Sequence, residues 1–193
     1  MEEEDSFFMS KMSLFPAEEL ELSLLKSRKR TEWLTSRYLL HLLSKREIRG
    51  ACLKDEYGKP YLEHSENFIS ISHSGEFTAV IGAARPVGID VQVFVPKIAR
   101  IVSKFINDEE WKYIPNDQSL FYFHAIWGAK ESIYKAYGKK GLDFKRHMSI
   151  DAFEFDAEGF FFQGTLNKDE ILRKYTLFCR KIENLILVYG VEI

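Results

Sequence analysis

Two carboxylates on separate segments of the chain have the clearest potential for chemistry. Asp90 lies in Val87-Gly-Ile-Asp-Val-Gln, and Glu131 lies in Trp127-Gly-Ala-Lys-Glu-Ser-Ile-Tyr-Lys. With them come an imidazole at His73 and many lysines and arginines, but no arrangement typical of a serine or cysteine nucleophile. Magnesium prefers six oxygen ligands and commonly takes one or two carboxylates, with phosphates and waters completing its shell. The inventory therefore indicates a metal-assisted phosphate site.

Residues 87–93 have the alternating pattern of a strand. Alternation places Gly88, Asp90 and Gln92 on one face, and the apolar Ile89, Val91 and Val93 on the other. The lack of a side chain at Gly88 is expected to let a bulky ligand approach the strand beside Asp90. Taken alone, the pattern also fits an ordinary strand with a solvent-facing polar side.

The second motif has helical spacing. Trp127, Glu131 and Lys135 lie at i, i+4 and i+8 and share one side of a helix, flanked by Lys130 and Tyr134. A common alternative is a simple ion pair between Glu131 and Lys135, which stabilises a helix by only about 0.3–0.5 kcal/mol. The pairing with Asp90 favours the functional interpretation.

Two turns carry weaker signals. Ser72 and His73 belong to Ile71-Ser-His-Ser-Gly, where backbone amides, a hydroxyl and an imidazolium can bind a phosphate. Lys59 belongs to Tyr57-Gly-Lys-Pro, a turn that presents one cation. A lone histidine is more often structural, so neither turn is specific by itself.

The elements that must position these residues follow from periodicity and capping. Two helices are expected between Pro16 and Ser44, with a break at residues 27–29. Asn107 is expected to cap a helix, with Glu110 completing a capping box, and a long helix should cover residues 119–137. A further helical segment is expected at residues 97–105, and strands at 68–72, 77–81, 87–93, 149–155, 160–166, 175–182 and 185–191.

This order predicts an α+β fold. We expect two subdomains, residues 1–88 and 89–193, related by a pseudo-twofold axis and each with helices packed on a small antiparallel sheet. No Gly/Ser-rich or Pro-rich linker separates them, which favours one compact unit with the site at the interface.

Composition and charge exclude several classes of protein. The 193 residues are 46% hydrophobic and 15% aromatic, enough for a core, and the net charge of −2 disfavours nucleic-acid binding. An acidic start argues against a secretory signal, and no apolar run is long enough to span a membrane, so a cytoplasmic location is expected. Cys52 and Cys179 have no metal-site spacing and are interpreted as buried, reduced thiols. Residues 26–49 carry eight bases and two acids, which suits a multiply charged anion.

The order of motifs resembles the 4′-phosphopantetheinyl transferase superfamily, specifically its surfactin-type branch. The motifs are Gly58-Lys-Pro, Ser72-His-Ser-Gly, Gly88-Ile-Asp, Trp127-x-x-Lys-Glu-x-x-x-Lys and Gly138-Lys-Lys-Gly-Leu. The resemblance covers residues 26 to 144, and the Gly-x-Asp and Trp-x-x-Lys-Glu pair is its most specific part. It implies a monomer that binds coenzyme A between its halves. It also implies transfer of 4′-phosphopantetheine to a serine of an apo acyl or peptidyl carrier protein, with release of 3′,5′-ADP.

The resemblance also implies roles for individual residues. Asp90 and Glu131 would hold Mg²⁺, or Mn²⁺ in its place, with Gln92 as a weaker third ligand or a holder of a coordinating water. Glu131, Lys135 and His73 would take part in catalysis. Coenzyme A would be bound by Arg30, Arg37, Lys59, Pro60, Ser72, His73, Lys130 and Lys135. The carrier is expected to dock on basic residues within 97–112 or 139–146, although the second group also fits a solvated loop.

Gln92 departs from the branch, whose members often have an acid at this position. A neutral amide is a weaker magnesium ligand, so one alternative is a non-catalytic module that binds coenzyme A or a carrier through a degraded metal site. A second alternative is another magnesium-dependent phosphotransferase or phosphohydrolase. Retention of Asp90, Glu131, Lys130 and Lys135 argues against decay.

Overall fold

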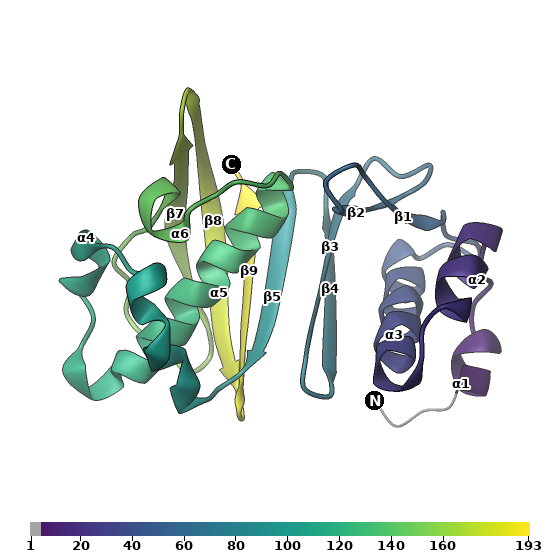
Figure 1. Cartoon of the computed structure of the whole chain (residues 1–193), viewed down its shortest axis with the longest axis horizontal. Helices are drawn as coiled ribbons and strands as arrows, with labels where there is room; N and C mark the ends of the chain where they lie inside the picture. Colours follow the sequence, from purple (N-terminus) through teal and green to yellow (C-terminus); the bar gives the residue numbers. More distant parts are fainter. Residues whose placement is uncertain (1–4) are drawn as a thin grey trace.

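The computed structural model describes residues 5–193, and Glu2, Glu3 and Glu4 of the acidic N-terminal stretch lie outside the described residues. Its elements form an α+β arrangement in which helices pack against antiparallel sheets. Figure 1 shows a helix-covered sheet at one end, the N-terminal helices at the other, and a β-hairpin between them. None of the described helices is long and apolar enough to cross a bilayer.

The N-terminal helices are α1 (Asp5–Met9), α2 (Pro16–Ser23) and α3 (Ser27–Ser44). The expected pair of helices between Pro16 and Ser44 is confirmed, but the break falls at residues 24–26 and Ser27 begins α3. Helix α1 was not anticipated.

Glu18 on α2 ties this helix to the strands that follow. Its carboxylate is 1% exposed and accepts two hydrogen bonds from Arg49 (2.8 and 3.0 Å) and one from the backbone N–H of Cys52 (3.0 Å). A buried carboxylate is tolerated only when it is paired in this way.

Strands β1 (Cys52–Lys54) and β2 (Pro60–Leu62) flank the expected turn. The Asp55 carboxylate accepts hydrogen bonds from the backbone N–H groups of Tyr57 and Lys59, both at 2.9 Å. Gly58 adopts a φ of +90°, which favours glycine. These contacts confirm the turn.

Strands β3 (Phe68–Ser74) and β4 (Phe77–Ala83) form an antiparallel hairpin. Strand β3 continues two residues beyond the expected end, so His73 lies within the strand, opposite Thr78, and not in the turn. Because neighbouring residues of a strand point to opposite sides, Ser72 and His73 face different surroundings. The placement of His73 in the turn is therefore corrected, while phosphate binding by Ser72 and His73 stays a prediction.

Strand β5 (Val87–Val93) leaves the hairpin and joins another sheet. This second sheet has five strands in the order β5-β9-β8-β7-β6, and all neighbouring pairs are antiparallel. The other strands are β6 (Met148–Ile150), β7 (Phe160–Lys168), β8 (Ile171–Ile182) and β9 (Leu185–Glu192). The expected subdomain boundary after residue 88 falls inside β5, every residue of which pairs with β9.

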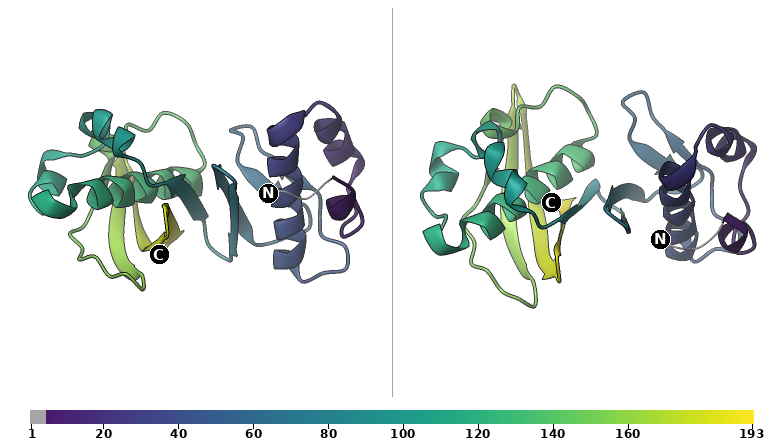
Figure 2. Two further views of the ribbon diagram at one scale, coloured as in Figure 1. Left: turned by 90° about the horizontal axis from the view of Figure 1, so that it is seen from below. Right: turned by 60° about the horizontal axis from the view of Figure 1, so that its bottom comes forward.

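Three serines of β3 connect the hairpin to the free edge of β5. The hydroxyls of Ser70, Ser72 and Ser74 accept hydrogen bonds from the backbone N–H groups of Ile89, Val91 and Val93, at 3.1, 3.2 and 3.3 Å. We call these three residues the serine ladder. Figure 2 shows from two further directions that the hairpin lies between α3 and β5. Side-chain oxygens thus satisfy a strand edge that would otherwise remain open.

The Ser70→Ala variant should lower the free energy of unfolding by about 1–3 kcal/mol, because it leaves the buried N–H of Ile89 without its acceptor. Urea denaturation measures this loss. The exposed Ser149 provides a control, since Ser149→Ala should change stability by less than about 0.5 kcal/mol. Equal losses in the two variants would contradict a stabilising ladder.

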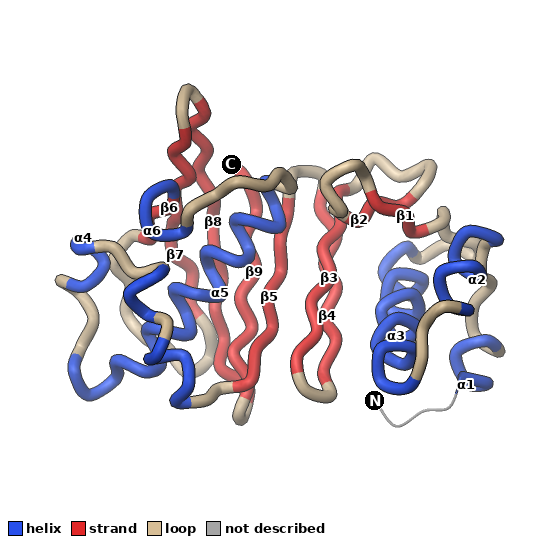
Figure 3. The backbone as a smooth tube through the Cα atoms, viewed as in Figure 1, coloured by secondary structure: helices blue, strands red, loops and turns tan. Residues whose placement is uncertain are grey.

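Helix α5 (Ser119–Tyr137) matches its predicted range and covers one face of the five-stranded sheet (Figure 3). A Cβ at Gly88 would lie 1.9 Å from the carbonyl oxygen of Ser132, and a Cβ at Gly128 would lie 2.7 Å from Val188. Both glycines allow the helix to approach the sheet closely. The expectation that Gly88 makes room for a ligand is therefore wrong; it makes room for α5.

Shorter elements connect β5 to α5 and α5 to β6. They are η1 (Pro96–Arg100), η2 (Val102–Lys104), α4 (Asp108–Trp111), η3 (Asn116–Gln118) and α6 (Phe144–His147). The expected capping box is confirmed, since Asn107 accepts from the N–H of Glu110 (2.9 Å) and donates its own N–H to the Glu110 carboxylate (2.8 Å). The cysteines are free and buried, as expected.

Candidate functional site

Asp90 of β5 and Lys135 of α5 meet between the sheet and its helix. The Lys135 ammonium donates to the Asp90 carboxylate (2.9 Å), the Ser72 hydroxyl (3.0 Å) and the Ile89 carbonyl (2.8 Å). The Ser72 hydroxyl in turn donates to Asp90 at 3.3 Å. The fold thus brings Asp90 together with Lys135 of the Trp127-to-Lys135 segment, and Ser72 supports the carboxylate from β3.

Two acidic groups share this desolvated space. Burial raises the pKa of Asp90, opposed mainly by the charge of Lys135. Burial, together with the charge of Asp90, raises the pKa of Glu131 to about 7, and Lys135 only partly offsets this. Two carboxylates that repel each other in a buried place suit a divalent cation, which removes that repulsion.

Gln92 lies beside Asp90, as strand alternation predicts. Its amide nitrogen donates to the Asp90 carboxylate (3.1 Å) and to the carbonyl oxygen of His124 (3.2 Å). Its amide oxygen lies 2.6 Å from Nδ1 of His124, a buried residue of α5 that sequence analysis did not single out. Burial lowers the pKa of His124 and so favours a neutral ring.

Lys130 does not lie where the diphosphate contact was expected. Its side chain is 0% exposed, and the ammonium donates to the Glu110 carboxylate (2.8 Å) and to the carbonyls of Phe105 (2.6 Å) and Phe144 (3.0 Å). Burial lowers the pKa of Lys130 and raises that of Glu110, and each charge opposes the shift of the other. Lys130 therefore belongs to a core ion pair, because α5 turns it away from Asp90.

Lys59 connects the two halves through the end of α5. Its ammonium donates to the carbonyls of Lys135 (2.8 Å) and Ala136 (2.7 Å), groups without partners inside the helix. Burial lowers its pKa to about 8. The Lys59 ammonium, which was expected to face a nucleotide, is thus hydrogen-bonded to the C-terminal end of α5. Lys59 and Pro60 still line cavities.

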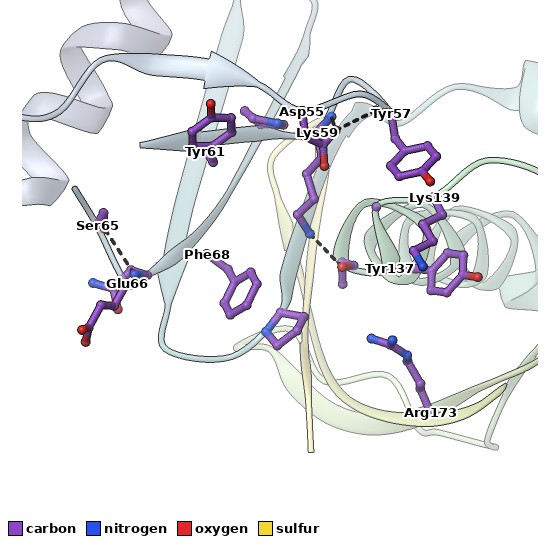
Figure 4. Close-up of a pocket in the computed structure, with 15 residues that line it drawn as sticks. Asp55, Tyr57, Lys59, Tyr61, Ser65, Glu66, Phe68, Tyr137, Lys139 and Arg173 are labelled. Carbon is purple, nitrogen blue, oxygen red and sulfur yellow. Dashed lines mark hydrogen bonds between the residues drawn. The ribbon is translucent and has the colours of Figure 1, made fainter. Parts of the chain in front are cut away.

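Three cavities adjoin around the turn that contains Gly58. One of about 520 Å³ is shown in Figure 4, where Tyr61 and Phe68 lie on one side and Tyr137, Lys139 and Arg173 on the other. A second, of about 230 Å³, is bordered by Lys135 and so reaches the Asp90 site. A third, of about 440 Å³, lies against α3.

The cavity against α3 contains some of the expected anion-binding residues. Arg37 and His73 line it, with Lys29 and Lys54 as cations that sequence analysis did not assign. The Arg37 guanidinium is 4% exposed, stacks 4.2 Å from the Trp33 ring centroid and pairs with Glu21 at 3.1 Å, and also with Glu18. Most of its charge is therefore already paired.

Arg30 lies elsewhere. It donates to Asp5 and, at 2.8 Å, to the carbonyl of Leu22, so it faces α1 and α2 and does not line the cavity. Arg30 and Arg37 therefore do not converge in this cavity, and help from Arg30 in binding a phosphate stays a prediction. Acidic residues of α1 and α2 pair with both arginines: Asp5 with Arg30, and Glu18 and Glu21 with Arg37.

The donor set fits a magnesium ion that is completed by a substrate. Among the described residues no group of three or more histidine, cysteine, aspartate or glutamate side chains converges as a closed metal site. Asp90 and Glu131 are two oxygen donors, and Mg²⁺ commonly binds one or two carboxylates while substrate phosphates and water fill the other positions. A site with only these two carboxylates would leave the remaining coordination positions to substrate phosphates and water.

Comparison with known proteins points to one family. The profile of the 4′-phosphopantetheinyl transferase superfamily matches residues 86–187, more than half of the chain. Similar proteins include a 4′-phosphopantetheinyl transferase of Bacillus subtilis, 34% identical over 44% of this chain and 39% of its own length. The 4′-phosphopantetheinyl transferase gsp of Aneurinibacillus migulanus is 31% identical over 56% of this chain and 46% of its own length. Sfp of Bacillus subtilis strain 168 is 32% identical over 50% of this chain and 44% of its own length.

These matches cover less than half of each relative's own length. The family profile nevertheless includes both segments that supply Asp90 and Glu131, and the fold brings these segments together between β5 and α5. The chain belongs to the 4′-phosphopantetheinyl transferase superfamily.

Proposed function

We propose that this chain transfers 4′-phosphopantetheine from coenzyme A to a serine of an apo carrier protein and releases 3′,5′-ADP. The observation that carries the proposal is the convergence of Asp90, Glu131 and Lys135 in a member of this family. The relatives compared above are named as 4′-phosphopantetheinyl transferases. The non-catalytic alternative is not favoured, because both carboxylates and Lys135 are in place.

Asp90 and Glu131 are the residues that would hold a magnesium ion. The ion, when bound, supplies charge neutralisation for the diphosphate of coenzyme A. Lys135 adds a positive charge beside the same space and is suited to stabilise or protonate the departing 3′,5′-ADP. Glu131 has a pKa near 7 and is suited to accept the proton of the carrier serine, directly or through water.

Coenzyme A is proposed to lie along the cavities that adjoin at Gly58. The cavity against α3 presents Lys29 to an anionic group, together with Lys54 and His73, which lie 2.8 Å from Glu21 and 3.8 Å from Glu32, and Lys135 borders the neighbouring cavity. This path joins a set of cations to the carboxylates without requiring Lys130 or Arg30. Positioning and charge neutralisation then account for most of the catalysis.

Intact mass spectrometry tests the proposal directly. A panel of apo acyl and peptidyl carrier proteins is incubated with the full chain, coenzyme A and Mg²⁺, with a chelator in parallel. A mass gain of one phosphopantetheine, lost with chelator, is the expected result. Bound coenzyme A without modification of any carrier would favour the non-catalytic module, and turnover of coenzyme A without a carrier would indicate a phosphohydrolase.

An apolar groove next to the site is proposed to receive the carrier. It measures about 440 Å³ and is lined by Val95, Ile98 and Ile101, with the exposed cations Lys97 and Arg100 at its margin. Gln92, which donates to Asp90, also lines it. An acidic helix beside the modified serine would match this apolar surface with basic margins.

Reversing the charge at Lys97 and Arg100 should raise KM for the carrier by about tenfold, since the variant repels an acidic partner. KM for coenzyme A should stay unchanged. A control with the same charge change is Lys174→Glu with Arg180→Glu, two exposed residues of β8. Steady-state kinetics with separate titration of each substrate distinguishes the effects, and an equal rise in the control would contradict docking at the groove.

A further inference from the structure

The orientation of the Gln92 amide follows from its neighbours. Two oxygens face one end of it, an Asp90 carboxylate oxygen at 3.1 Å and the His124 carbonyl oxygen at 3.2 Å. An amide oxygen placed there would meet two other acceptors and no donor, whereas the NH₂ group satisfies both. The amide oxygen must then point the other way, toward Nδ1 of His124 at 2.6 Å.

The backbone of Val95 lies at the other nitrogen of the His124 ring. Nε2 is 3.1 Å from the Val95 N–H and 3.0 Å from the Val95 carbonyl oxygen, and because the Gln92 oxygen calls for a proton on Nδ1, Nε2 is left to accept from the N–H. A neutral imidazole with a free Nε2 carries its proton on Nδ1, where it donates to the Gln92 oxygen. The contacts form one directed chain from Val95 through His124 and Gln92 to Asp90.

Turning the Gln92 oxygen toward a metal would reverse this chain. Gln92 would then present its NH₂ group to Nδ1, so His124 would have to carry its proton on Nε2. That proton could reach the Val95 carbonyl, 3.0 Å away, but the Val95 N–H would lose its partner. An unpaired donor and a repulsive contact with the His124 carbonyl both oppose the change.

We propose that His124 is a positioning residue that holds Gln92 as a hydrogen-bond donor to Asp90, so that Gln92 does not ligate the metal. This inference rests on the proposed function, because it concerns the same metal site. It revises the expectation that Gln92 is a third ligand. The amide takes the place that an acid occupies in many members of the branch, and it orients one carboxylate oxygen of Asp90 instead of adding a charge.

Packing holds the His124 ring in place. The side chain is 2% exposed, and the Phe94 ring lies 5.0 Å away between centroids. On the opposite side of Gln92, a Cβ at Gly128 would approach the amide nitrogen to 2.9 Å, so the absence of a side chain at Gly128 makes room for this rotamer. His124 and Gly128 both belong to α5, so this helix determines where the Gln92 amide lies.

The tautomer of His124 provides a readout that does not depend on catalysis. Long-range ¹H–¹⁵N correlation spectra of the full chain distinguish Nδ1–H from Nε2–H, and the His124→Asn variant assigns the signal among the five histidines. With Mg²⁺ and coenzyme A but no carrier, we expect His124 to remain Nδ1-protonated. A switch to the Nε2–H form would show that Gln92 turns to the metal and would overturn the proposal.

Binding of Mn²⁺, followed by electron paramagnetic resonance of the free ion, provides the second test. We expect Asp90→Asn to weaken binding by about tenfold or more, while the similarly sized Gln92→Met stays within about twofold of the unmodified protein. A loss in Gln92→Met as large as that in Asp90→Asn would make Gln92 a ligand. No loss in Asp90→Asn would contradict the metal site itself, which separates the two proposals.

A variant pair isolates the role of His124. His124→Leu removes the donor to Gln92 and should change the Mn²⁺ dissociation constant by about threefold or more, because the amide becomes free to turn. The change should vanish when Gln92 is also replaced by Met, and His124→Asn, which retains a donor near Nδ1, should restore the original constant. An equal effect of His124→Leu with and without Gln92 would reduce His124 to a packing residue and overturn the proposal.

Discussion

Glu131→Gln lowers the rate of phosphopantetheine transfer by about 100- to 1,000-fold, and Glu131→Ala abolishes measurable transfer. Both variants lose one of two carboxylates proposed to hold the metal and the group proposed to accept the serine proton. Coenzyme A binding should persist in part, because the cations that line the cavities remain. Single-turnover mass spectrometry and calorimetric titration with coenzyme A measure the two effects.

The pH dependence of stability distinguishes a loss of activity in Glu131→Gln from misfolding of the variant. Burial raises the pKa of Glu131 from its ordinary value of 4.5 to about 7 in the folded chain, so the unfolded chain releases this proton first as the pH rises. In chelator, its contribution to stability therefore falls as pH increases from about 4.5 to 7 and is lowest above that window. Glu131→Gln should remove this dependence and melt no lower than the unmodified protein at pH 8.

The exposed Glu109 supplies the matched control, since Glu109→Gln should leave transfer unchanged. Transfer that survives in Glu131→Ala would contradict the assignment of the metal site.

Lys130→Met destabilises the protein by about 3–5 kcal/mol, because it leaves the Glu110 carboxylate buried without its partner. Glu110 also accepts the N–H groups of Asn107 (2.8 Å) and Ile150 (2.9 Å), so the loss affects α4, α5 and β6 together. Urea denaturation measures the change. Lys112→Met, in an exposed pair with Glu109, should cost less than about 1 kcal/mol.

A second substitution tests the cause. Adding Glu110→Gln to Lys130→Met removes the unpaired charge and should recover a large part of the lost stability. A stable Lys130→Met variant with weakened coenzyme A binding would instead restore the diphosphate role that the motif resemblance implied.

Local patterns in the sequence were sufficient for several elements. The bounds of α5, the capping box of Asn107 and Glu110, and the turn at Asp55 depend on helical period, side-chain-to-backbone hydrogen bonds and a glycine at positive φ. These interactions link residues within a few positions of one another. Strand alternation likewise placed Asp90 and Gln92 on one face, and the motif order indicated the family.

The roles of individual charged residues depended on tertiary contacts. Lys130 and Lys135 both lie on α5, but only Lys135 faces Asp90, because Lys130 meets Glu110 from a different helix. Arg30 and Arg37 pair with Asp5 of α1 and Glu21 of α2, and the sequence pattern did not predict these contacts between helices.

The sequence by itself determined the family, and it predicted the type of site and the two carboxylates proposed for its centre. The tertiary structure alone decided that Gly88 accommodates α5, that the serine ladder closes the edge of β5, and that His124 orients Gln92. Each of these features joins residues far apart in the chain. Periodicity specifies which side of an element a residue occupies, but only packing specifies which element lies against that side.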